Sequence, residues 1–173
     1  MTYLARQRCK LLALIGVFAA PLLAAWVMVE LRIGIPDSKT AHGQLEPDHP
    51  VFEEWPVSSV TLNGEDWMLV FDCSIDCSQQ ADRWWRLHRA LGREAPRVSR
   101  LRIGGDAGEA LPGEQRAQWT RTPEWHSEGQ VWVLDPEGKP VLSYSSDVST
   151  EDVLDDIQLL LETNPEPPGG ADR

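Results

Sequence analysis

Cysteine, basic residues and long hydrophobic runs are all scarce in this sequence, and each shortage narrows the functions open to it. Three of the 173 residues are cysteine, and they do not have the spacing of a zinc site. The sequence also contains no phosphate-binding loop, no Ser-His-Asp set and no internal repeat. Its one group of chemically reactive residues is therefore the cysteine pair in the stretch CSIDC.

Basic residues number 16 against 27 acidic ones. Without residues 1–32 the chain carries 12 basic and 26 acidic side chains, a net charge of −14. So acidic a domain does not suit nucleic acid, and an anionic membrane surface would repel it. We interpret the acidity as a feature that keeps the domain soluble.

The one long hydrophobic run, LLALIGVFAAPLLAAWVMV at residues 11–29, is uncharged and long enough to cross a bilayer as a helix. Three basic residues precede it and only Arg32 follows closely, so the positive-inside rule places the N-terminus in the cytoplasm. We expect residues 1–32 to be a cytoplasmic N-terminus and single-pass anchor in a bacterial inner membrane, with the remainder in the periplasm. A cleaved signal peptide is the alternative, but Trp26 and Glu30 make a poor cleavage site.

Three further segments follow the anchor. Residues 33–56 are rich in proline, glycine and charge, and we expect a linker in which His42 and His49 are solvated. A folded domain is expected over residues 57–162. Residues 163–173 are rich in proline and glycine and are expected to form a disordered tail.

The pattern within the expected domain predicts an α/β fold. The apolar run WMLVF at residues 67–71 indicates a strand buried on both faces. A stripe of apolar residues from Cys77 to Leu91 predicts a helix. RVSRLRI at residues 97–103 is typical of a strand with one face in solvent. Two β-rich runs around DPEGKP then predict an antiparallel hairpin.

The rest of the domain is less regular. A short helix is expected near residues 112–120, and Ser149 with Asp152 predicts the capped start of a closing helix. A strand-helix-strand order implies a right-handed parallel crossover, with the hairpin as an antiparallel edge. Trp67 and Trp84 are expected in the core. Five other tryptophans are expected either to form an exposed aromatic patch that docks a membrane partner or to fill gaps in a small core: Trp55, Trp85, Trp119, Trp125 and Trp132.

The three cysteines fall on both sides of the predicted membrane. Cys9 precedes the hydrophobic run and is expected to be an inert apolar filler. Cys73 and Cys77 lie in the predicted outer compartment, where oxidising conditions permit a disulfide. Metal binding, thiol redox chemistry and a purely structural bridge are all open to this pair on spacing alone.

Over residues 57–161 the chain resembles the thioredoxin superfamily. The resemblance rests on the strand WMLVFD, a cysteine pair at the start of the next helix, and the hairpin VWVLDPEGKPVLSY followed by a helix. It implies a thioredoxin-like three-layer domain, a central mixed sheet flanked by helices. The CSIDC spacing is similar to that of the Sco/SenC branch, whose members are membrane-anchored and deliver copper to cytochrome c oxidase or keep its thiols reduced. The resemblance thus implies a Cu(I) site formed by Cys73, Cys77 and His126, the last from WHSEGQVWVLDP.

The predicted function is therefore assistance to cytochrome oxidase assembly, by delivery of Cu(I) or by reduction of a cysteine pair on an oxidase subunit. In the second case Cys73, expected to be the more exposed, attacks and Cys77 resolves the mixed disulfide. Carboxylates at Asp72 and Asp76 are expected to keep the Cys73 pKa near that of a free thiol. The alternative is a non-catalytic membrane scaffold with a structural disulfide that binds a membrane partner.

Overall fold

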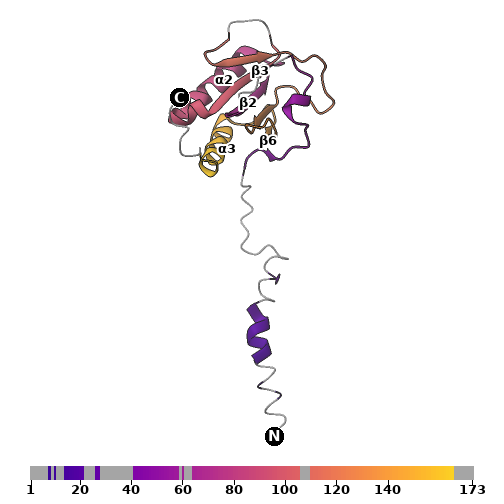
Figure 1. The fold of residues 1–173 in the computed structure, drawn as a ribbon, viewed down its shortest axis with the longest axis vertical. Helices are drawn as coiled ribbons and strands as arrows, with labels where there is room; N and C mark the ends of the chain where they lie inside the picture. The colour runs from indigo at the N-terminus through magenta and orange to yellow at the C-terminus, as the bar shows by residue number, and fades with distance from the viewer. Residues whose placement is uncertain are drawn as a thin grey trace. The chain divides into compact units, whose positions relative to one another are not determined.

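The computed structural model describes residues 8, 10, 14–21, 26–27, 41–58, 60, 64–105 and 110–165 (Figure 1). By its contacts the chain divides into two units, Met1–Thr40 and Ala41–Arg173. Cys9, residues 33–40 of the expected linker and most of the expected tail lie outside the described residues, as does about half of the hydrophobic run at residues 11–29. Among the residues that are described, no helix combines the length and apolar character needed to cross a bilayer.

The described residues of the second unit form a six-stranded mixed sheet (Figure 1). In spatial order its strands are β1 (Gln44–Leu45), β6 (Pro140–Tyr144), β5 (Val131–Leu134), β2 (Trp67–Asp72), β3 (Val98–Ile103) and β4 (Glu114–Ala117). β2, β3 and β4 are parallel to one another, and β5 pairs antiparallel with both β2 and β6. The predicted crossover and hairpin are both present, but β1 pairs with β6, so the hairpin does not form the edge of the sheet.

Both long helices, α2 (Cys77–Ala90) and α3 (Thr150–Thr163), pack on one face of the sheet. Side chains of a strand alternate between its two faces, so every second residue of β2 points toward these helices. The predicted apolar stripes are confirmed. The helices bury Ala81, Trp84, Leu87, Val153, Ile157 and Leu161 against sheet residues that include Leu69, Phe71, Val133 and Leu142.

Aromatic side chains from loops and from η1 (Phe52–Glu54) cover the opposite face of the sheet. Trp132 of β5 lies at the centre of this aromatic layer, with its ring centroid 5.1 Å from that of Trp55. Trp125 lies 4.9 Å from Trp55, and Trp119 lies 6.5 Å from Trp132. Trp55 and Trp132 are 4% and 0% exposed, so they fill a second core and do not form a docking patch.

Residues 41–56, which the sequence pattern assigned to a linker, are part of this folded unit. Phe52 is 4% exposed and packs in the aromatic layer. The ring of His49 lies edge-on to Trp125, with centroids 4.7 Å apart. The folded unit therefore includes residues that the sequence pattern placed in the linker, because long-range packing captures a segment that has no regular local pattern.

Two other segments differ from the sequence prediction. The region expected to form a helix at residues 112–120 contains β4, which pairs with β3 from Arg100↔Glu114 to Ile103↔Ala117. The β3 side chains Arg100 and Arg102, expected in solvent, are 1% and 5% exposed. Both errors have one cause. The EQRA stretch of β4 is polar, and its pairing with β3 encloses the charges that made both strands look solvated.

The start of α3 provides a test of local stability. The Ser149 Oγ accepts a 3.0 Å hydrogen bond from the backbone N–H of Asp152, as the capping pattern predicted. Replacing Ser149 by alanine is expected to lower the free energy of unfolding by about 1 kcal/mol, because the amide loses its acceptor. Denaturant titration measures this, with Ser146→Ala in the preceding exposed turn as the control. Equal stability of the two variants would mean that the cap is not needed.

Candidate functional site

A disulfide bond joins Cys73 and Cys77 where β2 leads into α2. Cys73 directly follows the last residue of β2, and Cys77 is the first residue of α2. Their Cα atoms are 4.7 Å apart, because a non-helical residue and a first-turn residue of a helix can face one another across four positions. The helix N-terminus favours a thiolate, since its unpaired N–H groups and dipole stabilise negative charge.

The two bridge residues differ in exposure. Cys73 is 1% exposed and belongs to the core beneath the helices. Cys77 is partly exposed, and the loop residues Ser74 and Ile75 beside it are exposed, Ile75 by 42%. The expectation that Cys73 is the more exposed sulfur is therefore wrong. Cys73 continues the alternation of β2, which directs its side chain to the same face as Phe71 and so under the helices.

Backbone in uncommon conformations surrounds the bridge. Asp76 precedes α2 with φ 42° and ψ 50°, the left-handed region that aspartate tolerates better than most residues. Gly105, just after β3, has φ +76° and lies against the bridge. A Cβ atom at Gly105 would lie 2.3 Å from the Cys77 Sγ, so any side chain there would displace the sulfur.

Arg102 of β3 brings a buried guanidinium to the Cys77 sulfur. Its Nη1 lies 3.8 Å from the Cys77 Sγ, and its Nε lies 3.6 Å from Oε1 of Glu114 on β4. The side chains of Arg102 and Glu114 are 6% and 0% exposed. A cation so close to a sulfur atom, and so well shielded from water, stabilises that sulfur as a thiolate.

Asp72 is the last residue of β2 and holds three loops together. Its carboxylate accepts hydrogen bonds from Trp119 Nε1 at 3.0 Å, from the Gly129 N–H at 2.9 Å and from the Ser74 hydroxyl. Burial opposes ionisation of Asp72, but these hydrogen bonds outweigh it and hold the pKa of the carboxyl below its ordinary value. The Asp72 carboxylate, which was expected to act on the pKa of the thiols, is thus already hydrogen-bonded to other groups.

His126 faces this carboxylate. Its Nε2 lies 3.1 Å from the Asp72 Oδ1, close enough for an ion pair when the ring is protonated but without the alignment of a hydrogen bond. The predicted copper ligands Cys73 and Cys77 share the bridge instead. Within the ranges that the structure describes, no group of three or more His, Cys, Asp or Glu side chains is arranged to hold a metal ion.

Sequence reasoning found the cysteine pair and His126 but missed Arg102, Glu114 and Gly105. The two arginines that alternate with apolar residues in VSRLRI were interpreted as the solvent-exposed face of a strand. Only the pairing of β3 with β4 distinguishes a buried arginine from an exposed one in such a pattern. The one signal in the sequence was the pair Gly104 and Gly105 after β3, since glycine in such a position often marks a place where another group lies close to the backbone.

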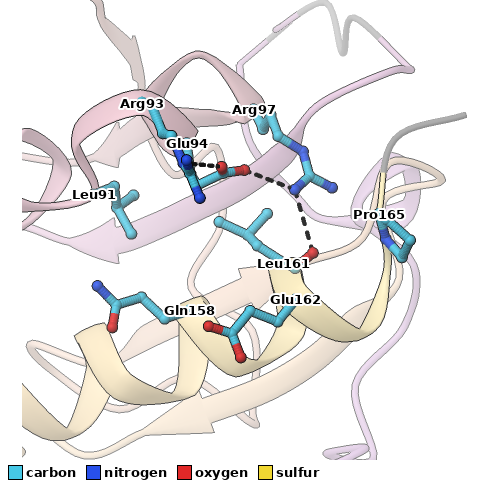
Figure 2. A pocket seen from close by; sticks show the side chains of 8 residues that line it. All are labelled: Leu91, Arg93, Glu94, Arg97, Gln158, Leu161, Glu162 and Pro165. Carbon is cyan, nitrogen blue, oxygen red and sulfur yellow. Dashed lines mark hydrogen bonds and ion pairs between the residues drawn. The ribbon is translucent and has the colours of Figure 1, made fainter. Parts of the chain in front are cut away.

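Two grooves lie apart from the bridge. One, of about 550 Å³, lies between η2 (Gly92–Arg97) and the end of α3. In Figure 2 Arg97 reaches from Glu94 to the main-chain oxygen of Leu161, so the guanidinium of Arg97 is already paired. The other, of about 670 Å³, is lined by polar residues that include His42 and Asp152. Neither lining contains a cysteine.

Comparison with known proteins links this chain to one family model and to several solved structures. The model described as "Transmembrane-like, thioredoxin-like, C-terminal domain" matches residues 67–164, from the start of β2 to just past α3. A search of curated proteins found no match.

Three of the similar solved structures come from a bacterium, a plant and a second bacterium. ScoI of Bradyrhizobium japonicum with copper bound is 14% identical, with 54% of this chain and 84% of that chain covered and a TM-score of 0.39. ScoI of Arabidopsis thaliana with copper bound is 12% identical, with 57% and 86% covered and a TM-score of 0.43. The thioredoxin domain of a thiol-disulfide oxidoreductase from Bacteroides vulgatus is 14% identical, with 70% and 99% covered and a TM-score of 0.41.

Proposed function

The chain belongs to the family of transmembrane-like, thioredoxin-like C-terminal domains, and from this premise we propose that it exchanges thiols and disulfides with a protein partner through Cys73 and Cys77. One observation carries the proposal. The bridge lies at the N-terminus of α2, and Cys77 is partly exposed, so it is the residue of the bridge that a visiting molecule can approach. A bridge that only held the fold would need no such opening.

The exchange needs only a partner that carries two thiols. One partner thiolate attacks a sulfur of the bridge, the S–S bond breaks, and the displaced cysteine leaves as a thiolate that takes a proton from solvent. The second partner thiolate then attacks the mixed disulfide and releases the second cysteine. The partner ends as a disulfide and this protein as a dithiol. The same steps in reverse reduce a partner disulfide.

The proposal extends to location and partner. An uncharged run at residues 11–29 behind three basic residues supports an inner-membrane anchor with the domain in the periplasm. The Sco-like CSIDC spacing supports a subunit of cytochrome c oxidase as the partner. In that setting the protein would reduce a disulfide of the subunit and so keep its cysteine pair as thiols, the form that can bind copper.

Replacing Cys73 and Cys77 together by serine is expected to abolish both disulfide exchange and oxidase maturation, because no sulfur remains to form the mixed disulfide. Turnover of a dithiol peptide and oxidase activity in membranes measure the two losses. Cys9→Ser is the matched control and should retain both. If the double variant folds and supports full oxidase activity, the protein is a scaffold and the bridge is structural.

Delivery of Cu(I) is the second candidate, with the metal as cargo. The support is that the His126 ring contacts Asp72, the residue directly before Cys73, so the third predicted ligand lies near the cysteine pair in the fold. Two thiolates and one imidazole suit Cu(I), but the bridge must first be reduced and the ring must leave the carboxylate. Titration of the reduced protein with Cu(I) tests this. Weaker binding in His126→Ala than in a His42→Ala control would support it, and absence of binding would exclude it.

A further inference from the structure

We propose that Cys77, and not Cys73, is the sulfur that joins the partner in the mixed disulfide, and that Arg102 stabilises its thiolate. This inference rests on the proposed exchange function and names the reacting atom within it. It reverses the order expected from the sequence, in which the first cysteine of the pair attacked and the second resolved.

Access to the two sulfurs supports this order. Exchange requires near-linear approach of the incoming thiolate along the S–S axis, so the attacked sulfur must face open space. Cys73 is 1% exposed and is packed in the core beneath the helices. Cys77 is partly exposed, and the exposed Ile75 beside it offers apolar surface to an incoming chain.

Charge around the bridge favours the same sulfur. Arg102 approaches Cys77 Sγ at 3.8 Å and is itself buried. Of the nearby acidic groups that the structure describes, Glu114 pairs with Arg102, and the Asp72 carboxylate accepts hydrogen bonds from Ser74, Trp119 and Gly129. Asp76 is exposed to solvent, which screens its charge. Cys77 also occupies the first position of α2, so the helix N-terminus and a guanidinium both act on one sulfur.

The steps follow from these positions. In the reduced protein the Cys77 thiolate attacks a partner disulfide, and the partner's second sulfur leaves as a thiolate. The Cys73 Sγ, which lies 3.5 Å from the Cys77 main-chain oxygen, stays next to the mixed disulfide. Cys73 then gives up its proton and attacks the Cys77 sulfur. The bridge closes and the partner's first sulfur is released, so two electrons have passed to the partner.

Variants of the full chain in the Cys9→Ser background, each with one cysteine of the pair also replaced, separate the two sulfurs, with glutathione disulfide as the probe of the reduced protein and intact mass as the readout. Cys73→Ser is expected to form a stable glutathione adduct at a rate within about threefold of that at which the probe oxidises the wild type to the Cys73–Cys77 bridge, because Cys73 resolves the wild-type adduct. Cys77→Ser is expected to form its adduct about a hundredfold more slowly. Faster adduct formation by Cys77→Ser overturns the inference while leaving the exchange function intact. A wild type that does not react with the probe overturns the exchange function itself.

The role of Arg102 is tested in the Cys73→Ser background with iodoacetamide, an uncharged alkylating probe. Arg102→Met is expected to move the pH midpoint of Cys77 alkylation upward by about one unit, and Arg102→Lys to restore most of it. Arg93→Met removes the same charge at a side chain 94% exposed and should move nothing. An unchanged midpoint in Arg102→Met overturns this role.

Glu114→Gln provides a second test that keeps the guanidinium in place. Without its carboxylate neighbour, the full charge of Arg102 acts on Cys77, so the alkylation midpoint is expected to fall. If Arg102→Met does not fold, this variant decides the question. A midpoint that rises or stays constant in Glu114→Gln then counts against the role of Arg102.

Discussion

Replacing Asp72 by alanine is expected to lower the free energy of unfolding by about 4 kcal/mol, because donors from three segments lose one shared, buried acceptor. Asp72 is 1% exposed, and its carboxylate accepts from Trp119 Nε1, the Gly129 N–H and the Ser74 hydroxyl. Those donors belong to segments that are far apart in the sequence. Their loss should therefore also loosen the loops around the bridge. Denaturant titration of the oxidised protein measures the change.

The pH dependence of this effect has a definite sign. The folded-state pKa of Asp72 is depressed, so its contribution is fully present above the pKa of the unfolded chain, about 4, and is lost as pH falls through the folded value. The stability gap between wild type and Asp72→Asn is therefore expected to be large at pH 7 and to shrink below about pH 4. Asp82→Asn, at an exposed helix position paired with Arg86, is the control. A gap that is constant from pH 7 to pH 3 contradicts this account.

Replacing Asp156 by alanine is expected to cost about 4 kcal/mol of folding free energy and to release the N-terminal segment of the folded unit. The Asp156 side chain on α3 is 3% exposed. Its Oδ2 accepts hydrogen bonds from the Gly43 N–H and the Tyr144 hydroxyl, each at 3.0 Å, and from the His42 N–H at 2.9 Å. Alanine leaves the buried Tyr144 hydroxyl and the two partly buried N–H groups without this acceptor.

Hydrogen exchange tests the second half of this prediction. Amides of residues 41–46 are expected to lose protection in Asp156→Ala to a greater extent than those of β2, because Asp156 joins that segment directly to α3. Asp155→Ala on the same helix is the matched control. Protection lost equally throughout the sheet would indicate global destabilisation and would contradict a local tether.

His42 gives the same contact a dependence on pH near neutrality. A hydrogen bond to Asp156 raises the pKa of His42 above its ordinary value. Stability from this pairing is therefore complete below the unfolded pKa, about 6.5, and is lost as pH rises through the folded value. Relative to His42→Gln, the wild type should be more stable at pH 6 than at pH 8. An equal difference at both pH values would show that the ring charge has no effect.

The sequence alone determined the order of the elements from β2 to β3 and from β5 to α3, and the meeting of the two cysteines. Apolar runs, a capped helix start and a turn-rich hairpin are local patterns, and local backbone preferences and periodicity are enough to specify β2, α2, the β5–β6 hairpin and α3. Cys73 and Cys77 come together for the same reason, because four residues span the junction of a strand and a helix.

The tertiary structure alone decided which cysteine is partly exposed, what lies beside it and that residues 41–56 belong to the folded unit. Arg102 looks solvated in the sequence and becomes a neighbour of Cys77 because β3 pairs with β2, which leads into α2, while Glu114 of β4 pairs with the guanidinium. His126 turns to Asp72, and Trp55 is buried against Trp132, through contacts between distant segments. Burial and partner choice are properties of such long-range packing, and no local periodicity encodes them.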